Sequence, residues 1–248
     1  MTHAARAYGL VRSLLMYYGM PFRGVRMRRL YAPFVGPGSL CFDVGAHAGN
    51  RVRCFRALGA RVVAVEPQRD FVRLLSLLFG RDEGVTILPM ALGAAPGTGE
   101  LHVSPRTPTV TTLSPEWIGE VRRDASFRRV TWTERERVEI TTLDALIAEH
   151  GRPAFIKIDV EGYEAQVLAG LSSAVDALSF EYLPAARHVA LECVDRLQSL
   201  GRYEYNWSPG ESHALASPRW LDAAGIRAFL EGLTPAAGSG DVYARLVA

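Results

Sequence analysis

Residues 40–49 have the sequence LCFDVGAHAG, an apolar run that gives way to a glycine-rich stretch. A short apolar run of this kind is typical of a strand that is buried on both faces of a parallel sheet. Gly45 and Gly49 would let the chain turn tightly and approach a ligand closely, and a helix that begins there would offer unpaired N–H groups to an anionic group. The stretch predicts the first strand–turn–helix unit of an α/β sheet. A glycine turn with a purely structural role is the alternative at this point.

Strands and helices alternate outward from this unit. Further strands are expected at residues 61–66, 85–88, 155–159, 178–182, 203–206 and 241–246, and helices at 49–58, 70–79, 143–149, 164–171, 187–200 and 218–230. This alternation is the pattern of a doubly wound, mostly parallel sheet with helices on both faces. In such a sheet, ligands bind at the carboxyl ends of the strands.

One long segment interrupts the alternation. Residues 104–134 show little periodicity and are rich in Ser, Thr, Pro and Arg. They lie between two short expected strands, at residues 100–103 and 138–141, and these two strands could pair as a hairpin. A non-periodic stretch of this length in a compact domain is usually a lid, a binding loop or a disordered segment. We therefore expect a lid-like insertion within one domain of residues 36–248, preceded by a helical extension of residues 1–35.

The composition narrows the class of protein. A net charge of +2 provides no global field for binding nucleic acid. The three cysteines form no CxxC pair, which argues against a zinc site and a disulfide framework and favours a cytoplasmic location. No apolar run reaches about 18 residues, so no transmembrane helix is expected. Lys157 is the only lysine among the 28 basic residues, and this bias toward arginine suggests a GC-rich bacterial genome.

The first 30 residues carry six arginines and no acidic residue. Two interpretations of this segment are open. It could be a solvated helix that leads into the domain, or it could present a surface to an anionic partner or to a membrane.

Glu66 ends the expected strand at 61–66, about 20 residues beyond the glycine turn, where an acidic side chain can accept hydrogen bonds from ribose hydroxyls. A dinucleotide-binding enzyme would carry the pattern G-x-G-x-x-G at that turn. Here the turn runs from Asp43 through Gly45 to Gly49 in the form DxGAxxG, which is typical of enzymes that bind S-adenosylmethionine (SAM), a cofactor without a pyrophosphate.

Residues 155–164, with the sequence FIKIDVEGYE, hold the densest set of polar groups. Three carboxylates, of Asp159, Glu161 and Glu164, lie at the end of a buried strand or directly after it, and the only lysine lies within that strand. Because the carboxyl ends of parallel strands face the ligand crevice, we expect this segment to line the site.

These motifs together resemble the FkbM family of SAM-dependent methyltransferases. The resemblance spans about residues 39–185, and it rests on DVGA at 43–46 with Gly49, Glu66 with Pro67, ALG at 91–93, and IKIDVEG at 156–162 with Glu164. It implies a Rossmann-like sheet of the class I methyltransferase type, with seven mostly parallel strands and an antiparallel last strand. It also implies SAM as the cofactor and methyl transfer to a hydroxyl of a small molecule or sugar, either a secondary metabolite or a glycan.

The resemblance implies a set of residues that bind the cofactor: Asp43, Gly45, Ala46, His47, Gly49, Glu66, Pro67, Ala91, Leu92 and Asp159. Ala91 and Leu92 would border the adenine ring. His47 would pack near the methionine end of SAM, and Asp159 would lie closest to the transferred methyl.

Methyl transfer to a hydroxyl requires alignment of the two groups and removal of the hydroxyl proton. The predicted catalytic residues are Asp159, which would orient the acceptor or the sulfonium, and a base. We prefer His213, in a turn after the strand at 203–206 with Glu211 close enough to orient it, and Glu181 is the alternative base. The carboxylates form no dedicated metal cage, so no metal ligands are assigned, and a divalent metal is an alternative that is not favoured.

The expected partner is a small-molecule or carbohydrate acceptor, and a homodimer is an open alternative. The main rival function is methylation of RNA or another nucleic acid. Amino-methylating enzymes of that kind carry an Asn/Asp-Pro-Pro-aromatic sequence where this chain has DVEG at 159–162, although four arginines of the insertion could bind phosphate: Arg122, Arg123, Arg128 and Arg129. A non-catalytic protein with a SAM-binding fold is a second rival.

Overall fold

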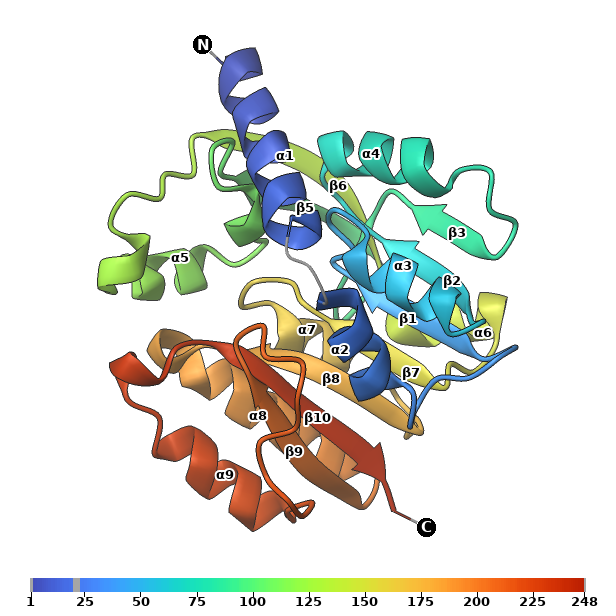
Figure 1. The fold of residues 1–248 in the computed structure, drawn as a ribbon. Helices are drawn as coiled ribbons and strands as arrows, with labels where there is room; N and C mark the ends of the chain where they lie inside the picture. The colour runs from blue at the N-terminus through green and yellow to red at the C-terminus, as the bar shows by residue number, and fades with distance from the viewer. Residues whose placement is uncertain (1, 20–22, 248) are drawn as a thin grey trace.

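The computed structural model describes residues 2–19 and 23–247. A seven-stranded sheet forms its centre, with the strand order β3-β2-β1-β7-β8-β10-β9 (Figure 1). The strands are β1 (Leu40–Val44), β2 (Arg61–Val65), β3 (Val85–Leu88), β7 (Phe155–Ile158), β8 (Ala177–Tyr182), β9 (Tyr203–Pro209) and β10 (Gly240–Leu246). Only β10 runs antiparallel to its neighbours. The predicted sheet with an antiparallel last strand is therefore confirmed.

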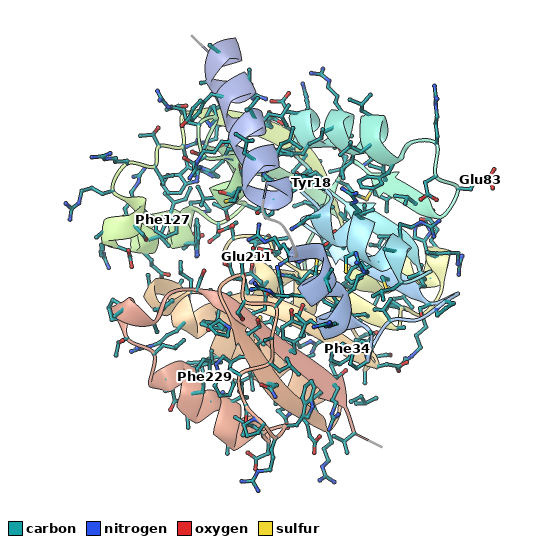
Figure 2. All side chains as sticks on the ribbon, in the orientation of Figure 1. Tyr18, Phe34, Glu83, Phe127, Glu211 and Phe229 are labelled. Carbon is teal, nitrogen blue, oxygen red and sulfur yellow. The ribbon has the colours of Figure 1, made fainter. Side chains whose placement is uncertain are left out.

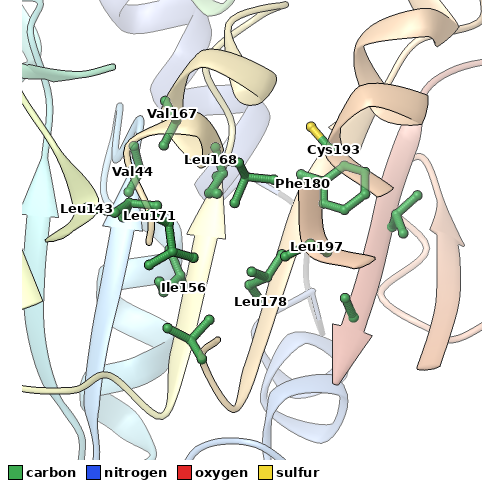
Figure 3. Packing of buried hydrophobic residues seen from close by; sticks show 14 of the residues in the cluster. Val44, Leu143, Ile156, Val167, Leu168, Leu171, Leu178, Phe180, Cys193 and Leu197 are labelled. Carbon is green, nitrogen blue, oxygen red and sulfur yellow. The ribbon is translucent and has the colours of Figure 1, made fainter. Parts of the chain in front are cut away.

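Helices cover both faces of the sheet, because successive side chains of each buried strand point to opposite faces. One face packs against α6 (Leu143–His150), α7 (Glu164–Ala169), α8 (Arg187–Leu200) and α9 (Ala223–Glu231). The opposite face packs against α2 (Arg23–Tyr31), α3 (Asn50–Ala57) and α4 (Arg69–Phe79). Figure 3 shows the first of these layers, in which Val44 and Ile156 of the sheet belong to the same apolar cluster as Leu168 of α7.

A second, three-stranded sheet follows β3 in the chain. It has the order β4-β6-β5, with β4 at Ala91–Leu92, β5 at Gly97–Val103 and β6 at Glu134–Thr141. Strands β5 and β6 pair antiparallel, in register from Gly97–Ile140 to Val103–Glu134. The hairpin that the sequence predicts is present, and both of its strands are longer than expected.

The insertion between β5 and β6 differs from the irregular segment that the sequence suggests. It contains α5 (Pro115–Val121) and two short 3-10 helices, η1 (Pro108–Val110) and η2 (Ala125–Phe127). Trp117 and Trp132 are buried there against the start of α8. The Ser114 side chain caps α5 by accepting a hydrogen bond from the Trp117 N–H at 3.1 Å, and a proline occupies the first helical position.

Helix α9 also differs from expectation, because it begins at Ala223 instead of residue 218. Its cap explains the later start. The Asp222 carboxylate accepts a hydrogen bond from the Gly225 N–H at 2.8 Å, while the preceding Leu221 forms a β-bridge with Tyr205.

The N-terminal extension forms two helices, α1 (Thr2–Tyr18) and α2. Leu10 and Leu14 of α1 pack against Phe71 and Leu74 of α4. The Arg6 guanidinium pairs with three carboxylates of α4 and β6, those of Asp70, Glu134 and Glu136. Among the described residues, no helix is both long enough and apolar enough to cross a membrane.

Candidate functional site

A cavity lies at the carboxyl ends of β1, β2 and β7, where a doubly wound sheet places its ligand. The turn after β1, the end of β2, strand β4 and the loop after β7 form its inner wall. Residues 108–113 of the insertion and Tyr17 of α1 close it from outside. Glu211, in the loop that follows β9, completes the wall, and Figure 2 shows it between the N-terminal helices and the C-terminal strands.

The turn after β1 is fixed against both neighbouring strands. The N–H groups of Gly45 and Ala46 donate hydrogen bonds to the Val65 carbonyl oxygen at 2.9 and 3.0 Å. Gly45 has a φ of 82°, and a Cβ atom there would lie 1.9 Å from the Asp159 carbonyl oxygen. Only glycine satisfies both conditions, so this residue sets how closely the turn approaches the end of β7.

Gly49 has a different role from the one the sequence suggests. Its φ is 77°, but a Cβ atom there would collide with the side chains of Phe79 and Leu75 at 2.5 and 2.8 Å. It does not line the cavity. Gly49 therefore permits the close packing of α3 against α4. It helps to position the turn after β1, but it does not face the cavity.

Glu66 is 2% exposed at the end of β2. Its Oε2 accepts a hydrogen bond from the His47 N–H at 2.7 Å, and its Oε1 accepts one from the Gln68 N–H at 2.8 Å. Burial raises the pKa of Glu66 to about 7 in spite of these two donors. Each oxygen keeps a second lone pair, so the carboxylate can still accept hydrogen bonds from a ligand.

The His47 ring is held by aromatic neighbours. It stacks on Phe71 with centroids 3.7 Å apart and meets Tyr17 edge to face at 5.5 Å. Burial lowers the pKa of His47 to about 3, so the imidazole is neutral at neutral pH. It forms part of the cavity wall, as the sequence predicts for this residue.

The loop after β7 is held by its own helix. The Glu164 carboxylate reaches back and accepts hydrogen bonds from the N–H groups of Val160 and Gly162, both at 3.0 Å. Gly162 has a φ of 87°, and a Cβ atom there would lie 2.1 Å from the Trp117 ring. The insertion therefore packs directly on this loop, and Glu164 acts in positioning it.

Three carboxylates meet at one end of the cavity. Oxygens of Asp159, Glu161 and Glu181 all lie within 4.8 Å of one another, and within residues 2–19 and 23–247 these are the side chains that could together hold a divalent cation. Burial, together with the charges of the neighbouring carboxylates, raises the pKa of Glu161 and of Glu181 well above the ordinary range. Glu161 and Asp159 line the cavity, and Glu181 stands behind them.

Lys157 supports this acidic end from within the core. Its side chain is 1% exposed, and its Nζ lies 3.1 Å from Asp159 Oδ2 and 2.9 Å from Asp241 Oδ1. Arg51 extends the chain of charges, with Nη2 3.9 Å from Asp241 Oδ2 and Nη1 3.7 Å from Glu211 Oε2. A buried ammonium is stable only when paired, so Lys157 fixes Asp159 to β10.

The position of His213 differs from the one expected of a base. The side chain is buried, its Nε2 lies 3.1 Å from Glu211 Oε2, and it does not line the cavity. Burial alone would raise the pKa of Glu211, but His213, Arg51 and Arg23 lower it to about 2. Glu211 faces the cavity, and His213 lies behind it as a positioning residue.

The sequence-predicted residues thus separate into two groups. Nine of them line the cavity: Asp43, Gly45, Ala46, His47, Glu66, Pro67, Ala91, Leu92 and Asp159. The other three, Gly49, Glu181 and His213, lie behind its wall. The insertion, expected as a lid, contributes Pro108, Thr109 and residues 111–113 to the cavity. Sequence reasoning missed Tyr17, which reaches the cavity through long-range packing, and it missed Arg51, whose place in the first turn of α3 is a local signal.

Comparison with known proteins gives this cavity its context. The model of the methyltransferase FkbM domain matches residues 43–205, which is more than half of the chain and includes the turn after β1, Glu66 and the loop after β7. The chain belongs to the FkbM methyltransferase family. The matched region is a methyltransferase domain of that family.

One curated relative of this FkbM methyltransferase is the hexuronic acid methyltransferase AglP of Haloferax volcanii. The two are 27% identical over 139 residues, which cover 56% of this chain and 52% of AglP. The chain therefore spans about half the length of that relative. Bacterial origin, cytoplasmic location and a homodimer stay predictions, and the relative is archaeal.

Two solved structures resemble this chain over most of its length, at low sequence identity. A SAM-dependent O-methyltransferase from Thermotoga maritima is 13% identical, with 95% of this chain and 70% of that chain covered and a TM-score of 0.41. A precorrin-6y C5,15-methyltransferase from Geobacter metallireducens is 10% identical, with 91% and 87% covered and a TM-score of 0.44. At these values neither structure says anything about the substrate of this chain.

Proposed function

We propose that this FkbM methyltransferase transfers the methyl group of SAM to a hydroxyl of a carbohydrate, with hexuronic acids as the first class to test. The observation that carries the proposal is the group of half-buried carboxylates of Asp159, Glu161 and Glu181, two of which line the same cavity as Glu66. The relative AglP is a hexuronic acid methyltransferase, which supports the choice of acceptor.

The cavity residues fit SAM. Asp43 is buried, and its Oδ2 has no hydrogen-bond partner within the described chain, which leaves an anionic acceptor for the methionine ammonium group. Arg51, whose Nε is also unpartnered there, is placed to bind the methionine carboxylate. Glu66 would accept hydrogen bonds from the ribose hydroxyls, and Ala91 and Leu92 would flank the adenine.

Bound SAM would supply an electrophilic methyl group, and the protein must supply a proton acceptor. A hydroxyl does not ionise at neutral pH, so a base removes its proton as the methyl is transferred. We assign this role to Glu161, because its carboxylate lines the cavity beside Asp159 and because its raised pKa makes the ionised carboxylate a stronger proton acceptor. Asp159 would orient the acceptor hydroxyl, and Glu181 would share the proton.

The test is methyl transfer from isotopically labelled SAM to a panel of acceptors. The panel contains oligosaccharides with glucuronic or galacturonic acid, their neutral counterparts, and an RNA fragment. We expect an O-methylated sugar, identified by mass spectrometry and by its methoxy resonance, and an inactive Asp159→Asn variant that still binds SAM. Transfer to RNA alone, or equal turnover by Asp159→Asn, would contradict the proposal.

A further inference from the structure

Helix α1 is apolar on both of its long sides. Its inner side, with Gly9, Leu10 and Leu14, packs on α4 and on the insertion. Its outer side repeats with helical spacing at Ala4, Ala7, Tyr8, Val11, Arg12, Leu15 and Met16, all exposed. Val11 is 55% exposed and Leu15 is 67% exposed. A surface helix normally turns polar residues outward. The outer side of α1 is apolar instead, and no part of the described chain covers it.

The large exposed apolar side chains of the described chain lie on three helices, and most of them are on α1. Every large hydrophobic residue with high exposure lies on α1, α2 or α4: Tyr8, Val11, Leu15, Met16, Val25, Leu77 and Leu78. Figure 1 shows α1 extending beyond the body of the fold, with the N-terminal end at the edge of the molecule. Scattered single exposures would need no explanation, whereas a concentration of this kind marks an interaction surface.

The charged residues that α1 and α2 themselves contribute are all arginines. Arg12 on α1 and Arg26, Arg28 and Arg29 on α2 are exposed and form no ion pair with the described residues. Helices α1 and α2 contain no acidic residue. An apolar helix side with arginines and without acids is complementary to an anionic lipid surface, and a second copy of the same face would set arginines against arginines.

We propose that the outer side of α1 inserts into the interface of an anionic lipid bilayer, with the arginines of α2 near the lipid headgroups. The helix is already fixed for this role. Arg6 ties it to Asp70, Glu134 and Glu136, and Gly9 lets it approach Pro105 so closely that a Cβ atom would lie 2.3 Å from that carbonyl oxygen. A preformed helix binds without the entropic cost of folding on the membrane.

The experiment is co-sedimentation with vesicles of phosphatidylcholine, alone or mixed with phosphatidylglycerol. Wild type should bind the anionic vesicles and be released by salt. The double variant Val11→Gln/Leu15→Gln should lower the partition coefficient by about tenfold or more, because two apolar side chains leave the interface. Arg12→Gln should lower the partition coefficient about fivefold. The matched control is Arg219→Gln, which changes an exposed arginine outside α1 and α2, and this variant should bind like wild type.

Two outcomes would overturn the proposal. One is wild-type protein that does not bind anionic vesicles, or a double variant that binds them equally well at an unchanged melting temperature. The other is a dimer, seen by light scattering, that the double variant splits into monomers in the absence of any vesicle binding. Methyl transfer to a water-soluble acceptor should be unchanged in the double variant, so this test is independent of the proposed acceptor.

Discussion

Carboxyl groups determine the chemistry of the cavity at the level of single residues. Burial raises the pKa of Asp43 and of Glu66 to about 7, and burial with the nearby Asp159 raises the pKa of Glu161 further above its ordinary range. A ligand that brings positive charge or donated hydrogen bonds stabilises their ionised forms. SAM brings both, in its sulfonium, its ammonium and its ribose hydroxyls.

The pH–rate profile distinguishes the two candidate bases. Glu161→Gln should lower kcat by about a hundredfold or more and remove the acidic limb of the profile, because the amide accepts no proton. His213→Gln should keep the acidic limb and most of the rate, since His213 contacts Glu211 and does not reach the cavity. The opposite pattern would return the role of base to His213.

The same profiles measured with a chelator address the metal alternative. Turnover that is unchanged by EDTA supports a carboxylate base. Turnover that EDTA abolishes and Mg²⁺ restores would mean that Asp159, Glu161 and Glu181 act as ligands instead.

At the level of elements, the insertion and the loop after β7 form one packed unit. Gly162 lies directly beneath the Trp117 ring, and its φ of 87° is strained for any other residue. Trp117 and Val121 are buried, while most of residues 122–131 are exposed. We therefore expect the mobile part of the insertion to be confined to residues 122–131.

Gly162→Ala tests this contact. The variant should lose about 1–3 kcal/mol of unfolding free energy in urea, and hydrogen exchange should accelerate in α5, because the added methyl group strains the backbone and displaces Trp117. Gly119→Ala is the matched control, since a Cβ atom there meets nothing within 4 Å, and the helix should gain up to about 1 kcal/mol. Equal behaviour of the two variants would show that Trp117 does not depend on Gly162.

The elements also show how far sequence reasoning reaches. Helix α8 was predicted at its observed bounds of 187 and 200, because fourteen residues are enough for the helical period to show. Helix α5 has only seven residues, too few for a period, although its Ser114-Pro115 start was a readable cap signal. The α9 start was placed too early because the backbone pairing of Leu221 with Tyr205 is a long-range contact.

For the whole molecule, the cavity joins segments that are far apart in the chain. The sequence motifs located the inner wall, since each follows a buried strand and parallel strands end at one edge. They could not locate the outer wall, where Tyr17 and Glu211 approach from the two ends of the chain. The same long-range packing turns Glu211 toward the cavity and leaves His213 behind it. Because both residues lie in one turn, the sequence does not show which of the two side chains faces the cavity.

The central claim is that this assembled cavity binds SAM with Glu66 on the ribose. The ionised carboxylate of Glu66 accepts hydrogen bonds more strongly than the protonated acid, and its pKa is about 7, so tight binding below that pH is coupled to loss of a proton. Affinity for the cofactor product should therefore rise from about pH 6 to about pH 8 and then level off.

Calorimetric titration with S-adenosylhomocysteine measures this directly. Wild type should bind one equivalent with the predicted rise, and Glu66→Ala should bind about 1–3 kcal/mol more weakly at the higher pH. The rise with pH should be smaller in this variant, because only the contribution of Asp43, whose pKa is also about 7, remains. Glu139→Ala, an exposed strand residue outside the cavity, is the matched control and should behave like wild type. Unchanged affinity and an unchanged pH profile in a folded Glu66→Ala variant would remove Glu66 from the site and contradict the account.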